Sequence, residues 1–148
     1  MDYNVLDKKF ISEKELYLFL SLVDKEFPIS LSKKTNLIET AKKLYILGDI
    51  FCIKDNKNII GLIAGYSNNT KDKTGYISVL AILNKYRGKG LASKLVNVFL
   101  DNAKKNGMNT VFLYTHASNV NAVKLYKRLG FYEVELKNND DYVLEKVL

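Results

Sequence analysis

A basic segment with two glycines, lying between a predicted strand and a predicted helix, is the first candidate for chemistry. Residues 85–92 read KYRGKGLA. The start of a helix carries partial positive charge and unpaired N–H groups, so bases there cost stability unless an anion binds. Gly88 and Gly90 would let the backbone approach a phosphate closely, and the guanidinium of Arg87 could bridge two phosphate oxygens. The segment therefore predicts a phosphate-binding loop; the alternative is a strand-to-helix turn with solvated charges.

A second segment, residues 119–131, reads NVNAVKLYKRLGF and follows the next predicted strand. Taken alone, it is a helix with Asn119 as its N-cap and with Tyr126 on a core-facing side beside Ala122 and Leu125. Both segments, however, follow strands that we expect to be parallel, and ligands of open α/β sheets bind at the carboxyl ends of such strands. The two segments are therefore expected to form one site.

The formal net charge is +7, and the excess is confined to one stretch. Residues 85–128 hold nine Lys and Arg residues against one acidic residue, Asp101, whereas the other fourteen bases face fifteen acids. Such a stretch suits a nucleic acid, an anionic membrane surface or a small anionic ligand. The bases surround one loop and two helix ends, without an aromatic stacking platform or a recognition-helix pattern, so they favour the small anion. We attribute Lys124, Lys127 and Arg128 largely to the dipole of a helix end.

Length and composition set further limits. A chain of 148 residues suits one domain over 1–148. The single cysteine, Cys52, excludes a disulfide framework, and the single histidine, His116, leaves no ligand set for structural zinc, so we expect no metal. No apolar run reaches the ~20 residues of a membrane span, and the N-terminus lacks signal-peptide features. We therefore expect a cytoplasmic protein with no membrane partner.

Helical spacing predicts two helices near the N-terminus. Ser12 and Glu15 form an S-x-x-E capping box for the first, and Pro28 marks its end. Asn36 caps the second, which stops at Gly48. The expected apolar stripes are Leu16, Phe19, Leu20 and Val23 in the first helix and Leu37, Ile38, Ala41, Leu44 and Tyr45 in the second.

Runs of β-branched and aromatic residues predict the strands. The predicted elements are an edge strand within 1–10, a hairpin of 49–54 and 59–66 around a turn at 55–58, buried strands 75–83 and 110–115, helices 87–106 and 119–129, and a closing hairpin of 131–137 and 142–147. The run 75–83 is typical of a strand covered on both faces, and the order of elements in 75–129 implies parallel pairing through a right-handed crossover. The fold class is therefore α/β, with a mixed α+β sheet of six or seven strands.

These residues and motifs resemble the GNAT superfamily of N-acetyltransferases. Arg87 to Ala92 fits the R/Q-x-x-G-x-G/A acyl-CoA loop of that family, and Asn119 to Phe131 fits N-x-x-A-x-x-L-Y-x-x-x-G-F. Asn84 stands before the loop, where the family often has proline. The resemblance covers most of the chain and implies the element order β-α-α-β-β-β-α-β-α-β-β, with the parallel strands splayed at the acyl-CoA site.

The resemblance implies acetyl-CoA as co-substrate and an amine as acceptor, without a metal. The backbone of Arg87 to Ala92 would hold the pyrophosphate, the strand edge at Leu80 to Ile82 would pair with the pantetheine amides, and Asn119 would bond the same arm. The implied coenzyme-binding residues are Leu80, Ala81, Ile82, Arg87, Gly88, Lys89, Gly90, Leu91, Ala92, Ser93, Asn119, Ala122 and Tyr126.

The implied chemistry is direct acyl transfer to a neutral amine, which does not need Cys52 as nucleophile. Tyr126 matches the family tyrosine that donates a proton to the departing thiolate. The base is open: His116, Tyr76 and Ser78 are candidates, as is a chain of waters, and His116 could equally be structural.

In the resembling family the first helices shape the acceptor pocket, here around residues 24–49. Four acids and five bases in that range give no acidic lining, so the sequence favours a small-molecule amine, such as an amino sugar or sugar nucleotide. A protein N-terminus or a lysine is the alternative acceptor. A non-catalytic acyl-CoA sensor and a nucleic-acid-binding module are the alternatives of another class, and the protein is expected to be a monomer or a homodimer.

Overall fold

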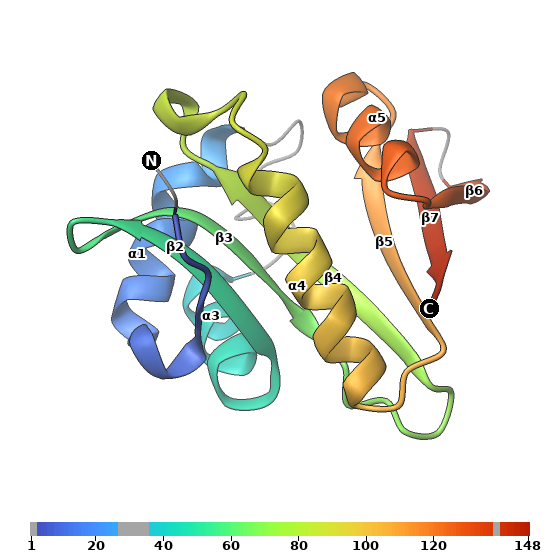
Figure 1. Cartoon of the computed structure of the whole chain (residues 1–148), viewed down its shortest axis with the longest axis horizontal. Coiled ribbons are helices and arrows are strands. Elements are labelled where there is room, and N and C mark those ends of the chain that lie inside the picture. The colour runs from blue at the N-terminus through green and yellow to red at the C-terminus, as the bar shows by residue number, and fades with distance from the viewer. Residues whose placement is uncertain (1–2, 27–35, 138–139) are drawn as a thin grey trace.

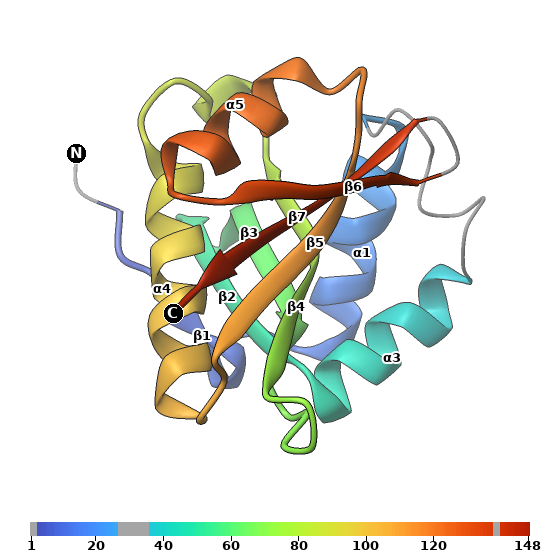
Figure 2. The same ribbon diagram turned by 90° about the vertical axis from the view of Figure 1, so that its right-hand side faces the viewer.

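The computed structural model describes residues 3–26, 36–137 and 140–148, and these build a seven-stranded sheet in the order β1-β2-β3-β4-β5-β7-β6 (Figures 1 and 2). The strands are β1 (Leu6–Asp7), β2 (Asp49–Asp55), β3 (Asn58–Tyr66), β4 (Thr74–Ile82), β5 (Thr110–His116), β6 (Tyr132–Lys137) and β7 (Asp141–Val147). The helices are α1 (Glu13–Val23), α3 (Leu37–Leu47), α4 (Leu91–Lys105) and α5 (Val120–Arg128), with short 3-10 turns at Lys8–Phe10, Asp24–Glu26 and Asn84–Tyr86. The predicted α+β mixed sheet with one parallel pair is confirmed.

Local sequence signals account for the first two helices. Ser12 Oγ accepts the N–H of Glu15 at 3.0 Å while the Glu15 carboxylate accepts the N–H of Ser12, which completes the predicted capping box of α1. Asn36 caps α3, and Gly48 follows its last turn as expected. The stripe of α1 is buried throughout, but in the predicted stripe of α3 only Ala41 and Leu44 are buried, and Ile38 is 61% exposed. Pro28, expected to end the first helix, lies outside the described residues.

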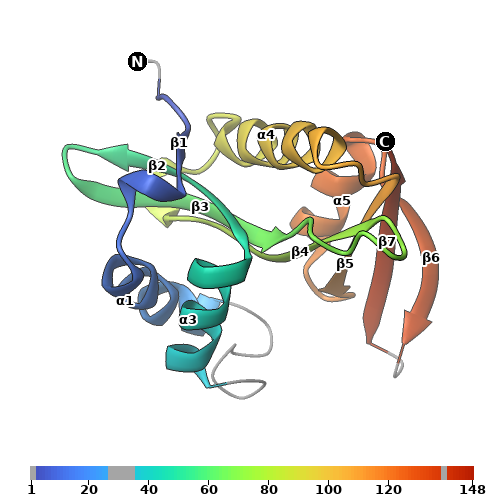
Figure 3. The ribbon, with the colours of Figure 1, turned by 90° about the horizontal axis from the view of Figure 1, so that it is seen from below.

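The sheet separates two apolar cores. On one face α4 packs against strand residues such as Ile63 and Ile77, and on the other α1 and α3 pack against Leu62 and Val79 (Figure 3). Neighbouring strand residues such as Leu62 and Ile63 serve opposite cores because their side chains alternate across the sheet. Within the described ranges, no helix is both long and apolar enough to span a membrane.

Both predicted hairpins are present. The β2–β3 turn is tighter than expected, because Asn56, at φ 56°, and Lys57 alone connect the two strands. The β6–β7 hairpin closes the chain, and β6 forms an exposed edge of the sheet.

Strand β4 pairs with β5 in parallel over only four residues. The register runs from Thr74–Thr110 to Ile77–Leu113, and there the pairing ends. At the same level Gly65 pairs with Ile77 and Ala64 with Val79, so Ser78 forms a bulge in β4. Beyond this point the two strands diverge (Figure 2).

Buried residues of β4 lie on both faces of the sheet, as predicted, because Ile77 belongs to the core against α4 and Val79 to the core against α1 and α3. The cover is incomplete. Ile77, Val79 and Ala81 are buried, but Tyr76 and Leu80 are half-buried. The same alternation holds for β5, where Tyr114 is exposed. In β5 the buried residues Val111 and Leu113 both belong to the core against α4, and the opposite side, with Phe112 and Tyr114, is less covered, so this strand is not buried on both faces.

A substitution at Gly65 tests whether the Ser78 bulge requires the close approach of the β3 and β4 backbones. A Cβ there would collide with the carbonyl oxygen of Tyr76 and lie 2.9 Å from Phe99 Cζ, so Gly65→Ala is expected to cost about 1–3 kcal/mol of unfolding free energy in urea denaturation. Gly61→Ala is the matched control, since its nearest neighbours are the ends of two flexible side chains, Ile82 and Leu95. Equal losses in the two variants would show that the bulge tolerates a side chain.

Candidate active site

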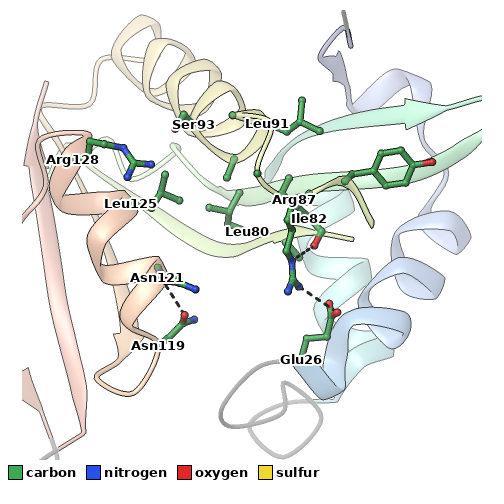
Figure 4. Close-up of a pocket in the computed structure, with 16 residues that line it drawn as sticks. Glu26, Leu80, Ile82, Arg87, Leu91, Ser93, Asn119, Asn121, Leu125 and Arg128 are labelled. Atoms are coloured by element: carbon green, nitrogen blue, oxygen red, sulfur yellow. Dashed lines mark hydrogen bonds and ion pairs between the residues drawn. The ribbon is translucent and has the colours of Figure 1, made fainter. Parts of the chain in front are cut away.

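One cavity of about 380 Å³ lies where β4 leaves β5, between the start of α4 and one side of α5 (Figure 4). The cavity brings together both sequence motifs. Its lining residues are Glu26, Leu80, Ala81, Ile82, Tyr86, Arg87, Gly88, Gly90, Leu91, Ala92, Ser93, Asn119, Asn121, Ala122, Leu125 and Arg128. Of the predicted coenzyme-binding residues, only Lys89 and Tyr126 do not line it.

The glycine loop forms one end of the cavity. Helix α4 begins at Leu91 and not at 87 as predicted, because Gly88 and Gly90 have φ values of 78° and 77°, which interrupt a right-handed helix. The first turn of α4 has no acidic residue and no side-chain cap. The first N–H groups of any helix lack intrahelical acceptors and form the positive end of its dipole. Because no side chain of the loop satisfies them in α4, they are available to a phosphate.

The edge of β4 supplies a second set of backbone groups. The N–H of Leu83 donates to the carbonyl of Ile60 in β3 at 2.8 Å. Because backbone direction alternates along a strand, Leu80 and Ile82 present their N–H and C=O groups to the gap that β5 has left. The carbonyl oxygen of Ile82 is already used, since Arg87 Nε donates to it at 2.9 Å.

The side chain of Arg87 does not point toward the glycine loop. Its guanidinium lies 3.3 Å from a carboxylate oxygen of Glu26, in the 3-10 turn that follows α1 (Figure 4). Arg87 therefore connects the start of the loop to the end of α1. Figure 4 shows this ion pair at the opposite end of the cavity from Ser93.

The first turn of α5 forms the facing wall. Asn119 caps the helix, with its side-chain oxygen accepting the N–H of Ala122 at 3.3 Å, so the amide NH₂ is the group left for a ligand. Asn121, Leu125 and Arg128 follow at helical spacing along the same side.

Tyr126 is the buried residue of α5. Its ring packs edge-on against Phe131 with centroids 5.2 Å apart, and its side chain belongs to the core beneath the helix. Burial raises the pKa of its hydroxyl well above the ordinary value, so this group stays protonated at physiological pH. The sequence placed Ala122 and Leu125 on this core-facing side. Ala122 packs against the core and also lines the cavity, whereas Leu125 lines the cavity without belonging to the core cluster.

The three base candidates lie apart from the cavity lining. The Tyr76 ring packs on Phe112 and Tyr114, and burial raises the pKa of Tyr76, which leaves a neutral phenol suited to positioning water. Ser78 is the half-buried bulge residue of β4. The N–H of Ser118 donates to His116 Nδ1 at 3.1 Å, so the basic nitrogen of the neutral ring already holds the turn before α5.

Cys52 is fully buried among the residues that face α1 and α3. Desolvation raises the pKa of its thiol to about 11, so it is not an activated nucleophile. Five further residues line the cavity that the sequence did not predict there: Glu26, Tyr86, Asn121, Leu125 and Arg128. The 121, 125, 128 spacing on one helix was the signal available for three of them.

The comparisons with known proteins agree with this geometry. The model of the acetyltransferase (GNAT) family matches residues 16–131, and the chain belongs to this family, as the motif resemblance predicted.

The chain is 39% identical over 83 residues to N-alpha-acetyltransferase 30 of Schizosaccharomyces pombe, a match that covers 55% of each protein. It is 30% identical over 124 residues to N-alpha-acetyltransferase MAK3 of Arabidopsis thaliana, covering 82% of this chain and 63% of that one. The chain thus spans between about half and two thirds of the length of these relatives.

Among solved structures, Arabidopsis thaliana NAA60 in complex with a bisubstrate analogue has a TM-score of 0.80 at 18% identity, covering 99% of this chain and 98% of that one. PaiA N-acetyltransferase of Thermoplasma acidophilum, in complex with coenzyme A, has a TM-score of 0.74 at 17% identity, with both chains covered in full. At these identities the likeness concerns the fold.

Gly90→Asp is expected to weaken coenzyme A binding about 10-fold or more, because it strains a positive φ and puts a carboxylate among the N–H groups that would hold phosphate. Gly107→Asp is the control: Gly107 also has positive φ and open space around it, but follows the other end of α4. Isothermal titration gives the Kd, and thermal melting checks folding. Equal Kd values for the two variants would remove the loop from the binding site.

Proposed function

We propose that this protein transfers the acetyl group of acetyl-CoA directly to a primary amine, and that the amine is the N-terminus of a polypeptide. The observation that carries the proposal is a cavity that joins a phosphate-type helix start, an unpaired β4 edge and the cap of α5. The helix start suits the phosphates of coenzyme A. The β4 edge and the α5 cap suit its amide-containing arm.

Each part of the cavity has a separate task. The N–H groups at Leu91, Ala92 and Ser93 would bind phosphate oxygens. The backbone groups of Leu80 and the N–H of Ile82 would pair with the amides of the arm as an added strand would. Ala81 lines the same edge, and Asn119 would donate its amide NH₂ to the arm from the facing wall.

Acetyl-CoA supplies an acetyl group activated as a thioester. The chain must then orient the amine, accept its proton and return a proton to the sulfur that leaves. Tyr126 is our candidate for the last step because it matches the tyrosine of the family motif. Burial raises the pKa of its hydroxyl, so it keeps its proton until a strong base such as the thiolate forms beside it. His116 is proposed to accept the amine proton through water once its Nδ1 is released from the Ser118 N–H, or the water chain itself carries the proton to solvent. Tyr76 and Ser78 are proposed to position that water, because a neutral phenol and an alcohol do not take up a proton.

The acceptor is assigned from the relatives. Several relatives that match at 30% identity or more are named N-alpha-acetyltransferases, which favours an N-terminal α-amine over the small molecule that the sequence alone suggested. A small-molecule amine is the second candidate, because mycothiol acetyltransferase of Corynebacterium efficiens is 32% identical over 83 residues, covering 27% of that protein.

A panel of amines tests the function. Acetyl-CoA and short peptides with free N-termini are expected to release coenzyme A thiol and to gain acetyl at the α-amine, located by mass spectrometry. The same peptides with blocked N-termini control for lysine acetylation, and amino sugars test the second candidate. Binding of acetyl-CoA without acetylation of any amine would support the sensor instead.

Tyr126→Phe is expected to lower kcat about 100-fold or more while leaving the Kd for coenzyme A within about twofold, because the ring that packs on Phe131 is retained and only the proton donor is lost. Pre-steady-state acetylation and titration with coenzyme A measure the two quantities. Unchanged kcat would leave Tyr126 with a packing role only.

A further inference from the structure

The chain has two arginines, Arg87 and Arg128, and both line the cavity. The sequence favoured Arg87 as the phosphate ligand, from its place in the glycine loop, and attributed Arg128 to the dipole of a helix end. In the structure, Arg87 is paired with a carboxylate, and Arg128 extends toward the start of α4.

The guanidinium of Arg87 already has two partners. Its Nε donates to the Ile82 carbonyl at 2.9 Å, and its NH2 group lies 3.3 Å from Glu26. These contacts hold the charge at the end of the cavity where α1 terminates (Figure 4). A phosphate at the start of α4 would have to compete with a carboxylate and a carbonyl for this group.

Arg128 extends from the last turn of α5, and Figure 4 shows it on the side of the cavity where α4 begins, near Ser93. In the described part of the chain no carboxylate lies within 4.0 Å of its guanidinium, whereas its neighbour Lys127 is 3.9 Å from Glu133. Arg128 is thus a cavity-lining guanidinium without a carboxylate partner, and it faces a helix start that carries no acid.

We propose that Arg128, on α5, binds a phosphate group of acyl-CoA opposite the N–H groups of α4, and that Arg87 does not. The inference rests on the proposed function. A guanidinium can donate two parallel hydrogen bonds to phosphate oxygens, and the N–H groups of Leu91 to Ser93 would hold the same group from the other side. The phosphate is either in the pyrophosphate or at the 3′ position of the ribose, and both have the same chemistry toward Arg128.

Titrations of the full chain with three ligands test the proposal. Arg128→Gln is expected to raise the Kd for coenzyme A about 10-fold or more and to leave the Kd for pantetheine, which has no phosphate, unchanged. Arg128→Lys should recover part of the affinity, because it restores charge without the planar fork. Lys127→Gln is the matched control on the same turn, and Arg87→Gln should weaken coenzyme A binding less than Arg128→Gln.

Dephospho-CoA distinguishes the two phosphates. Dephospho-CoA lacks the 3′-phosphate. Equal Kd values of wild type and Arg128→Gln for this ligand would assign Arg128 to the 3′-phosphate, whereas a higher Kd in the variant would assign it to the pyrophosphate. Equal coenzyme A affinity in wild type and Arg128→Gln, or an equal loss for pantetheine, would overturn the inference alone. A wild-type protein that binds no coenzyme A would overturn the proposed function with it.

Discussion

Parallel pairing between β4 and β5 ends at Ile77 and Leu113, and the whole cavity depends on that end. Past it, β5 still has a partner in β7, but the edge of β4 from Leu80 to Ile82 has backbone groups with no strand beside them. Buried or half-buried backbone groups need hydrogen-bond partners, so an edge inside the sheet is a binding surface for an extended ligand. The Ser78 bulge belongs to the same feature, because it turns β4 at the level where the pairing stops.

The side chains around the gap follow from this constraint. One partner for the open edge comes from the chain itself, since Arg87 uses the Ile82 carbonyl. The helices on either side are held apart by the diverging strands that precede them, so the start of α4 and the side of α5 face one cavity without filling it. Tyr126 packs beneath α5 with Phe131 and fixes the rotation of that helix. Asn121, Leu125 and Arg128 on another side of the helix then line the cavity.

Local signals made the element order and most of the cavity predictable. The Ser12 capping box, the glycine loop and the Asn119 cap each act over a few residues, and the parallel order of strands brought the last two together. What could not be predicted was the direction of single side chains. In α5 and at its C-cap, Ala122, Tyr126 and Leu129 pack on the core, but Leu125, which lies at about 100° of helix rotation from Tyr126, lies on the cavity wall. The pair between Arg87 and Glu26 joins residues 61 positions apart, so neither residue's neighbours in the sequence indicate it.

The basic stretch also has a different meaning in three dimensions. Its charges do not form one continuous field: Arg87 is neutralised by Glu26, Lys127 lies near Glu133, and Lys104 and Lys105 lie in the last turn of α4, where cations complement the dipole. In the proposed binding mode, recognition of an anion in the cavity would therefore depend on oriented N–H groups and one guanidinium at short range, and not on accumulated surface charge. Short-range contacts in a partly enclosed site are screened little by salt, whereas a nucleic acid held by many surface lysines would dissociate steeply as salt rises. The distribution of charge in the fold thus favours a single phosphorylated small molecule over a polyanion.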